Sequence, residues 1–274
     1  MISLFKCPIC GNALNKEEKR LVCESNHSFD IAAANYVNLL PVNKKHSKSP
    51  GDDAEMVRAR EKFLSAGYYK TLRDKIVETV ASLSESKPVK LIDIGCGEGY
   101  YTEEVASLNN VETAAFDISK TAAEKTGKRI KRTGAHSEAA VASAFDSPVN
   151  DCCFDIALNI FSPLCIPELS RILKSGGYFL YVVPAPDHLW EMKELIYENP
   201  YKNVDEKQEY DGFDFSDKIR VRYTEEITSN ESIKALFGMT PYFWHTPKAY
   251  MSKLDNIHSL RVTVDFFILI YKKI

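Results

Sequence analysis

The segment LIDIGCGEGYYTEEVASL, residues 91–108, reads as the end of a strand, a glycine-rich turn and a helix. The apolar run before the turn is short and β-branched, as expected of a central strand in a parallel sheet. Gly95, Gly97 and Gly99 remove Cβ atoms where the backbone must approach a ligand. A helix is expected behind them at residues 102–108. The segment therefore predicts an α/β fold that holds a nucleoside-type ligand at the carboxyl end of this strand.

The spacing of the glycines indicates which ligand is held. Dinucleotide-binding loops follow G-x-G-x-x-G, whereas this loop is G-x-G-x-G with Asp93 ahead of it. That spacing suits a ligand without a pyrophosphate, and S-adenosylmethionine is such a ligand. Asp117 ends the next predicted strand, where a carboxylate can accept both ribose hydroxyls. Ala144 and Phe145 end the third, where an adenine would be sandwiched.

Strands continue to alternate with helices beyond the loop, which predicts a doubly wound, mostly parallel sheet. A glycine turn and an apolar strand after the fourth strand favour a methyltransferase over a dehydrogenase. Two late strands would close one sheet edge antiparallel, as in a seven-stranded, Rossmann-like class I methyltransferase. The expected strands are residues 89–94, 111–119 and 138–148, one from 154, one within 168–186, and 218–224 and 262–273.

Four soft-metal ligands lie near the start of the chain, in residues 7–30. Cys7 and Cys10 form a C-x2-C pair, and Cys23 and His27 follow as a second pair. A C-x2-C turn aims two thiolates at one point, and a second pair can complete a tetrahedron around zinc. The alternative, two cysteine pairs packed as small apolar groups, fits a hydrophilic segment less well. All four positions would be filled by protein, so the predicted zinc site is structural.

Composition limits the function classes only loosely. The 274 residues carry a net charge of −3, so no overall basic charge points to nucleic acid, although residues 43–49, 58–62 and 125–132 are locally basic. No long apolar run predicts a transmembrane helix. An odd number of cysteines, seven, favours a reducing compartment and a cytoplasmic protein.

The expected domain organisation is a zinc module at 1–40, a linker with helices at 41–85 and a methyltransferase domain at 86–274. One linker helix is predicted from Asp53 to about residue 65, with an acidic N-cap. A second is predicted over residues 66–83.

Several motifs resemble the RlmA (RrmA) family of guanine-N1 methyltransferases of large-subunit ribosomal RNA. The resemblance covers nearly the whole chain and is most specific in SPGDDAEMVRAREKFLSAGYY, residues 49–69. PAPDHLWEMKELIY, residues 184–197, is another of the motifs that carry it. It implies methyl transfer from S-adenosylmethionine to N1 of a guanine in a 23S ribosomal RNA hairpin loop. It also implies zinc in the N-terminal module and a possible homodimer. Which of two neighbouring guanines is methylated stays open. The positions that match cofactor contacts are Tyr69, Glu98, Gly99 and His188.

The catalytic residues are not fixed by the sequence. His188 is a candidate base, with an ordering or cofactor contact as the alternative. Asn159 and Phe161 lie where amino-methyltransferases place a base-stacking motif, and Phe161 is equally compatible with a rim aromatic. The alternative function is a methyltransferase of a small molecule or of another RNA, with zinc purely structural. A non-catalytic module on the same fold is disfavoured by the glycines and Asp117.

Overall fold

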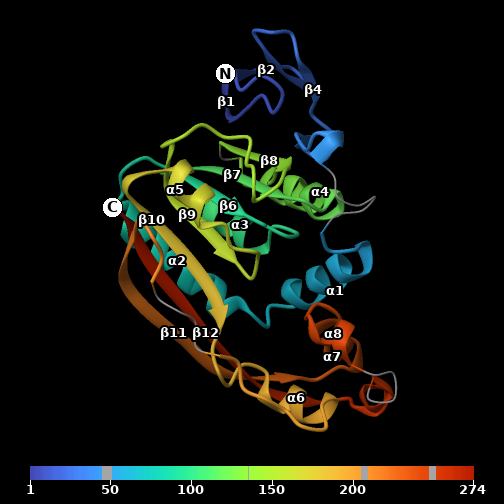
Figure 1. Ribbon diagram of the computed structural model, residues 1–274. Coiled ribbons are helices and arrows are strands. Elements are labelled where there is room, and N and C mark those ends of the chain that lie inside the picture. Colours follow the sequence, from blue (N-terminus) through green and yellow to red (C-terminus); the bar gives the residue numbers. More distant parts are fainter. Residues whose placement is uncertain (45–50, 135, 205–208, 247–250) are drawn as a thin grey trace.

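The computed structural model describes residues 1–44, 51–134, 136–204, 209–246 and 251–274. It contains two sheets, and the small one lies at one end of the molecule (Figure 1). The small sheet has the order β1-β2-β3-β4 and the large one β11-β12-β10-β9-β6-β7-β8-β5. The small-sheet strands are Ile2–Lys6, Ala13–Glu17, Arg20–Cys23 and Ser28–Asp30. The large-sheet strands in chain order (β5–β12) are Tyr36–Asn38, Val89–Ile94, Val111–Asp117, Ser137–Val141, Phe154–Ile160, Leu173–Pro184, Phe213–Ile227 and Leu260–Lys273.

The large sheet is mostly parallel, as predicted. β12 pairs antiparallel with both β10 and β11, and the remaining neighbours pair in parallel. The predicted strand count of seven is wrong, because β5 adds an eighth strand beside β8. The sequence did not indicate this strand, since its three residues are too few for an alternating pattern and depend on β8 for their hydrogen bonds.

Helices cover both faces of the large sheet. α1–α8 are Ala54–Ser65, Lys70–Ser84, Tyr100–Ala106, Lys120–Ile130, Ile166–Ile172, Trp190–Ile196, Asn230–Gly238 and Tyr242–His245, and the short 3-10 turns are Val42–Lys44 and Ser252–Asn256. α7 and α8 lie at the opposite end of the molecule from the small sheet (Figure 1). No helix in the described ranges is both long and apolar enough to cross a lipid bilayer.

The linker helices begin where backbone chemistry allows. Asp53 caps α1, because its Oδ1 accepts the amides of Glu55 and Met56 at 2.9 and 2.8 Å. The second helix begins at Lys70, four residues later than predicted, because Gly67 takes a left-handed φ of +89° and breaks the helix. Most of the basic segment 43–49 lies outside the described residues.

The small sheet shares a core with the large one. Leu4, Phe5 and Leu21 belong to one buried cluster with Phe116 and Ala140 of the large sheet. The amide of Lys6 donates to the carbonyl of Pro148, and Ser3 Oγ donates to Glu138. The expected boundary at residue 40 lies just beyond β5, so the last strand of the predicted zinc module is a strand of the large sheet.

Candidate functional site

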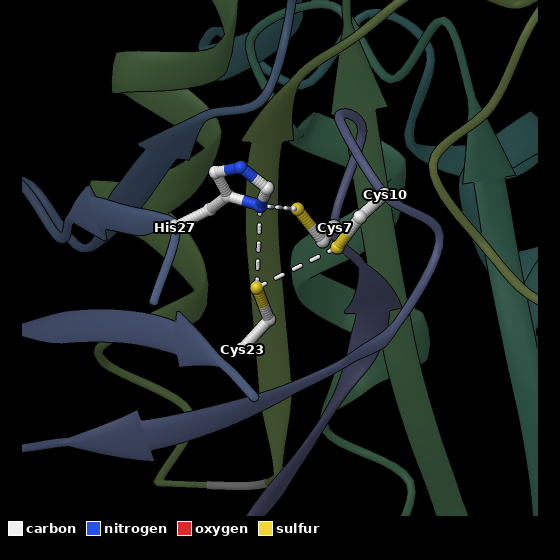
Figure 2. Close-up of side chains that lie close together, drawn as sticks. All are labelled: Cys7, Cys10, Cys23 and His27. Carbon is white, nitrogen blue, oxygen red and sulfur yellow. Dashed lines mark hydrogen bonds between the residues drawn. The ribbon is translucent and has the colours of Figure 1, made fainter. Parts of the chain in front are cut away.

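The four predicted zinc ligands converge in the small sheet (Figure 2). Their ligand atoms all lie within 4.8 Å of one another. Cys10 Sγ is 3.6 Å from Cys23 Sγ, and His27 Nδ1 is 3.5 Å from the sulfurs of both Cys7 and Cys23. Tetrahedral zinc, with bonds of about 2.3 Å to sulfur and about 2.0 Å to nitrogen, needs edges of about 3.5–3.8 Å. The donor set and these three distances therefore fit zinc, with all four positions taken by protein.

Two tight turns produce this geometry. Gly11 has a φ of +77° and its amide donates to the carbonyl of Cys7, as the predicted chain reversal requires. Asn26 has a φ of +61° in the second turn and donates to the carbonyl of Cys23. The backbone amide of Asn12 lowers the pKa of Cys10 to about 6, which favours the thiolate that binds metal.

The glycine loop joins β6 to α3. Gly95, Gly97 and Gly99 have φ angles of +72°, +57° and +84°, all in the left-handed region. A Cβ on Gly95 would lie 2.5 Å from Ser162 Cβ, and one on Gly99 would lie 2.8 Å from Thr126 Cα. The loop therefore needs glycine both for conformation and for space.

Residues far away in the sequence hold the loop in place. Ser162 Oγ donates to the carbonyl of Ile94 at 2.8 Å, and Thr126 Oγ1 donates to the carbonyl of Gly97 at 2.8 Å. Arg60 Nη1 would lie 3.4 Å from a Cβ on Gly97. The sequence pattern did not single out these three supporting side chains, because nothing local marks Ser162 or Thr126. The distinctive run at residues 49–69 was the signal available for Arg60.

Two carboxyl groups at the loop are buried. Thr102 Oγ1 donates to Asp93 Oδ2 at 2.6 Å, while Oδ1 has no hydrogen-bond partner among the described residues. Glu98 Oε1 also lacks a partner within the described ranges. Burial raises the pKa of Asp93 to about 7 and raises the pKa of Glu98, against the effect of Arg60. Unpartnered buried acceptors are costly, so both groups suit a cationic ligand.

Asp117 lies beside the loop, as predicted. Its Oδ2 accepts the amide of Gly97 at 3.0 Å, and its Oδ1 accepts the amide of Ser119 at 2.8 Å. Burial raises the pKa of Asp117, whereas these two amides lower it. Each carboxylate oxygen has a further lone pair, so the side chain is oriented and can still accept from a ligand.

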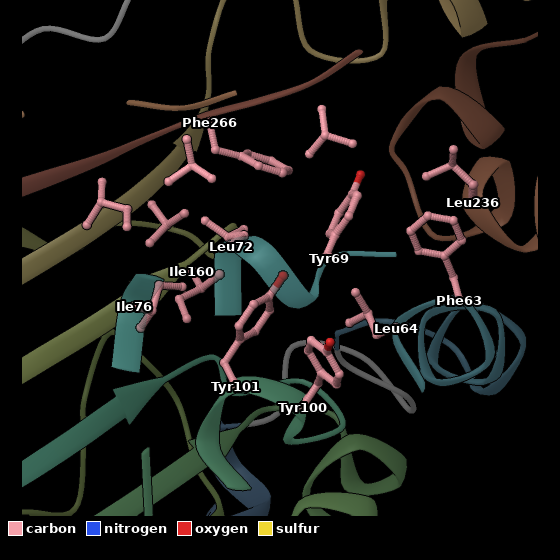
Figure 3. Packing of buried hydrophobic residues seen from close by; sticks show 14 of the residues in the cluster. Phe63, Leu64, Tyr69, Leu72, Ile76, Tyr100, Tyr101, Ile160, Leu236 and Phe266 are labelled. Atoms are coloured by element: carbon pink, nitrogen blue, oxygen red, sulfur yellow. The ribbon is translucent and has the colours of Figure 1, made fainter. Parts of the chain in front are cut away.

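Tyr69 and His188 meet although they are 119 residues apart. Tyr69 packs between Phe63 and Phe266, with ring centroids 5.1 and 5.2 Å away (Figure 3). The amide of Asp265 donates to His188 Nδ1 at 3.3 Å, and the Tyr69 hydroxyl lies 3.3 Å from Nε2. Burial lowers the pKa of His188 to about 3. The imidazole is therefore neutral, with its proton on Nε2 directed at Tyr69.

The segment after β9 separates the two residues of the predicted stacking motif. Asn159 is buried, and its amide donates to the carbonyl of Pro163 at 3.1 Å. Phe161 is 44% exposed and adopts a φ of +56°, which is strained for a bulky residue. Its ring rests on Phe266, with centroids 4.9 Å apart. Phe161 thus faces the surface, while Asn159 shapes the loop.

The remaining predicted positions follow β8 and β10. Ala144 is half-buried and Phe145 is exposed after β8. Asp187 lies just before α6 and does not cap it, because Leu189 with a φ of +54° is the N-cap. The Asp187 carboxylate instead accepts from Lys202 and Arg222, at 2.7 and 2.6 Å.

The sheet order, the glycine loop and the acidic residues at the ends of β6 and β7 define a class I S-adenosylmethionine-dependent methyltransferase. A methyltransferase-domain family model matches residues 85–236, and a model of the RlmA N-terminal zinc ribbon matches residues 5–48. The chain belongs to the RlmA family of 23S ribosomal RNA (guanine-N1)-methyltransferases, as the sequence resemblance implied.

Similar proteins cover the full length. YxjB of Bacillus subtilis, provisionally named a 23S rRNA (guanine-N(1)-)-methyltransferase, is 32% identical over 99% of this chain and 98% of its own. The 23S rRNA (guanine(748)-N(1))-methyltransferase of Streptomyces fradiae is 29% identical over 97% of this chain and 96% of its own. The solved YcgJ protein of Bacillus subtilis has a TM-score of 0.51 at 16% identity, over 72% of this chain and 97% of its own, and supports the fold alone.

Proposed function

We propose that this protein transfers a methyl group from S-adenosylmethionine to N1 of a guanine in a hairpin loop of 23S ribosomal RNA, in the cytoplasm. The observation that carries the proposal is the 32% identity to YxjB over almost the full length of both chains. That identity spans the zinc ribbon and the methyltransferase domain together. If this chain were a general small-molecule methyltransferase, similarity to YxjB would be needed only in the methyltransferase domain and not in the zinc ribbon.

The proposed cofactor site is formed by the glycine loop and its neighbours. Asp117 is oriented by two amides to accept from the ribose, and Ala144 with Phe145 would flank the adenine. The buried oxygens of Asp93 and Glu98 would accept from the cofactor's ammonium group. Gly95, Gly97, Gly99, Tyr69 and His188 complete the proposed set of contacts.

The reaction needs alignment more than acid–base chemistry. Bound S-adenosylmethionine supplies an electrophilic methyl group and a good leaving group, so the protein's task is to hold the guanine nitrogen in line with it. We assign His188 to positioning, because its Nδ1 lone pair faces the amide of Asp265 and its Nε2 carries the proton. In this scheme the N1 proton of guanine leaves to water.

Phe161 is the proposed stacking platform for the guanine. It is exposed, strained and backed by Phe266, whereas Asn159 is buried. An RNA base taken out of its loop can stack on such a ring, typically for about 1–3 kcal/mol. Asn159 then acts by fixing the loop through the carbonyl of Pro163.

The test is methyl transfer from labelled S-adenosylmethionine into 23S ribosomal RNA transcripts. We expect label in 1-methylguanosine upon nucleoside mass spectrometry, and a reverse-transcription stop at one hairpin guanine, because a methyl group on N1 blocks the Watson–Crick edge. The matched control is a transcript with the candidate guanines replaced by adenine, which should take up no label. Label in other nucleosides or only in small metabolites would overturn the proposal. Light scattering of the same preparation tests the proposed homodimer.

A further inference from the structure

Three residues of the linker segment, Gly51 and Asp52 before α1 and Arg60 within it, connect that segment to the glycine loop and to the residues after β7. We call these three residues the clasp. Arg60 Nη1 lies 2.6 Å from Asp52 Oδ2. The same side chain covers Gly97, with Nη1 at 3.4 Å and Cδ at 3.8 Å from a Cβ built there. One arginine thus connects the linker segment to the centre of the cofactor loop.

The clasp also docks on the segment that follows Asp117. Ser119 Oγ donates to the carbonyl of Asp52 at 2.9 Å. A Cβ on Gly51 would lie 2.7 Å from Ile118 Cγ2 and 3.1 Å from the amide nitrogen of Ser119. Gly51 has a φ of +80°, so both its conformation and its close contact require glycine. These contacts hold the segment before α1, and with it Arg60, in a fixed position relative to the glycine loop.

The charges around Arg60 identify what it could bind. Three carboxyl groups interact with it: Asp52 in an ion pair, and Glu98 and Asp117 through their electrostatic coupling to the guanidinium. Within the described part of the chain, Glu98 Oε1 and Asp93 Oδ1 have no hydrogen-bond partner, so both can accept from cationic groups. Arg60 is 26% exposed and brings fixed donors to the same loop. A guanidinium and buried carboxyl groups at the same loop offer partners for both charges of a zwitterion.

We propose that Arg60 binds the α-carboxylate of the cofactor's amino-acid end, with Asp52 orienting its guanidinium. The proposal rests on S-adenosylmethionine being the ligand, as in the proposed function, and deepens it by assigning the anionic group of that ligand a partner. A planar guanidinium can hold a carboxylate through two parallel hydrogen bonds while a further N–H keeps Asp52. The linker helix thereby becomes part of the cofactor site.

The test compares two ligands that differ by one group, S-adenosylmethionine and its decarboxylated form. Dissociation constants are measured by calorimetry without RNA, for the full chain and for Arg60→Gln. The variant should bind S-adenosylmethionine about 10- to 100-fold more weakly, the usual range for a charge-assisted hydrogen bond. It should bind the decarboxylated ligand nearly as well as the unchanged chain does.

The matched control is Arg58→Gln, which removes an exposed arginine from the same helix and should leave both constants unchanged. Arg60→Lys should recover part of the affinity, since it restores the charge without the planar fork. Equal losses for both ligands in Arg60→Gln would overturn the proposal and make Arg60 a structural support of the loop. Failure of the unchanged chain to bind S-adenosylmethionine would instead overturn the proposed function, while a different methylated nucleoside would leave the Arg60 assignment intact.

Discussion

The zinc ribbon and the glycine loop are assembled in opposite ways. The ribbon takes its four ligands from residues 7–27, and two turns bring them together. The glycine loop depends on Arg60, Thr126 and Ser162, which come from distant segments. A local site such as the ribbon can be recognised from the spacing of its ligands in the sequence. A site at the edge of a sheet depends on how the whole domain packs.

The two regions also differ in what stabilises them. The ribbon is small, so metal coordination is expected to provide much of its folding free energy. The loop is stabilised by buried side chains of the large sheet and α3, including the Tyr100 and Tyr101 cluster (Figure 3). Removing the metal should therefore affect mainly the zinc ribbon, whereas a substitution that disturbs packing at the glycine loop should affect mainly the large-sheet domain.

The largest expected effect is loss of the metal. Cys23→Ser should release zinc, unfold strands β1–β4 and weaken RNA binding, while cofactor binding is largely retained. Structural zinc is worth about 10–16 kcal/mol in small zinc peptides. Metal content by mass spectrometry and the dissociation constant for S-adenosylmethionine check this. Cys152→Ser, at an exposed cysteine outside the cluster, is the control. Simultaneous loss of cofactor binding would show that ribbon and large sheet fold as one unit through β5.

The next effect tests packing at the loop. Gly99→Ala places a Cβ 2.8 Å from Thr126 Cα at a φ of +84°. The left-handed conformation and the overpacking together should lower the free energy of unfolding by about 2–4 kcal/mol and weaken cofactor binding, with zinc content unchanged. Gly176→Ala is the control, because its φ is +76° but its nearest atom is Lys272 Cε at 3.9 Å. Urea unfolding of both variants measures the difference. Equal losses of unfolding free energy in the two variants would show that the close contact with Thr126 is not the cause.

Removing the proposed ribose partner should weaken cofactor binding. Asp117→Ala is expected to weaken the binding of S-adenosylmethionine by about 1.5–3 kcal/mol, the value of a hydrogen bond to a charged group. Asp155→Ala serves as the comparison, since Asp155 accepts the amide of Lys90 at 2.9 Å at the amino edge of the sheet. Calorimetric titration measures both variants. An unchanged constant in Asp117→Ala would mean that the ribose contact is misassigned.

The smallest effect is a pH dependence of the buried carboxyl group at the loop. The pKa of Asp93 is raised from 3.8 to about 7 by burial, so its ionised form is disfavoured in the free protein. Stability should therefore fall as pH rises from about 4 to about 7 and then level off. Affinity for the cationic ligand should rise through about pH 7, because the ligand favours the ionised carboxylate.

Asp93→Asn should flatten both profiles while it keeps an acceptor for Thr102. Thermal unfolding and titrations at pH 5, 6, 7 and 8 provide the measurement. Profiles that keep their slopes in the variant would assign the pH dependence to another buried carboxyl group at the loop, and Glu98 and Asp117 are the first alternatives, since burial raises the pKa of both.

Sequence alone determined the features that depend on short spacing. The four zinc ligands, the three glycines and Asp117 at the end of β7 could be recognised because turn chemistry and strand alternation act within a few residues. The mostly parallel sheet followed from the regular alternation of strands and helices. The RlmA resemblance came from long motifs that no general methyltransferase pattern requires.

Tertiary structure alone decided which distant residues meet. It placed β5 in the large sheet, set Tyr69 against His188, buried Asn159 while exposing Phe161, and laid Arg60 over Gly97. A local sequence pattern cannot predict these contacts, because each one joins segments that are distant in the sequence and meet only when the core packs. Burial then fixed the chemistry, since it made His188 neutral and left Asp93 and Glu98 with acceptors to share with a ligand.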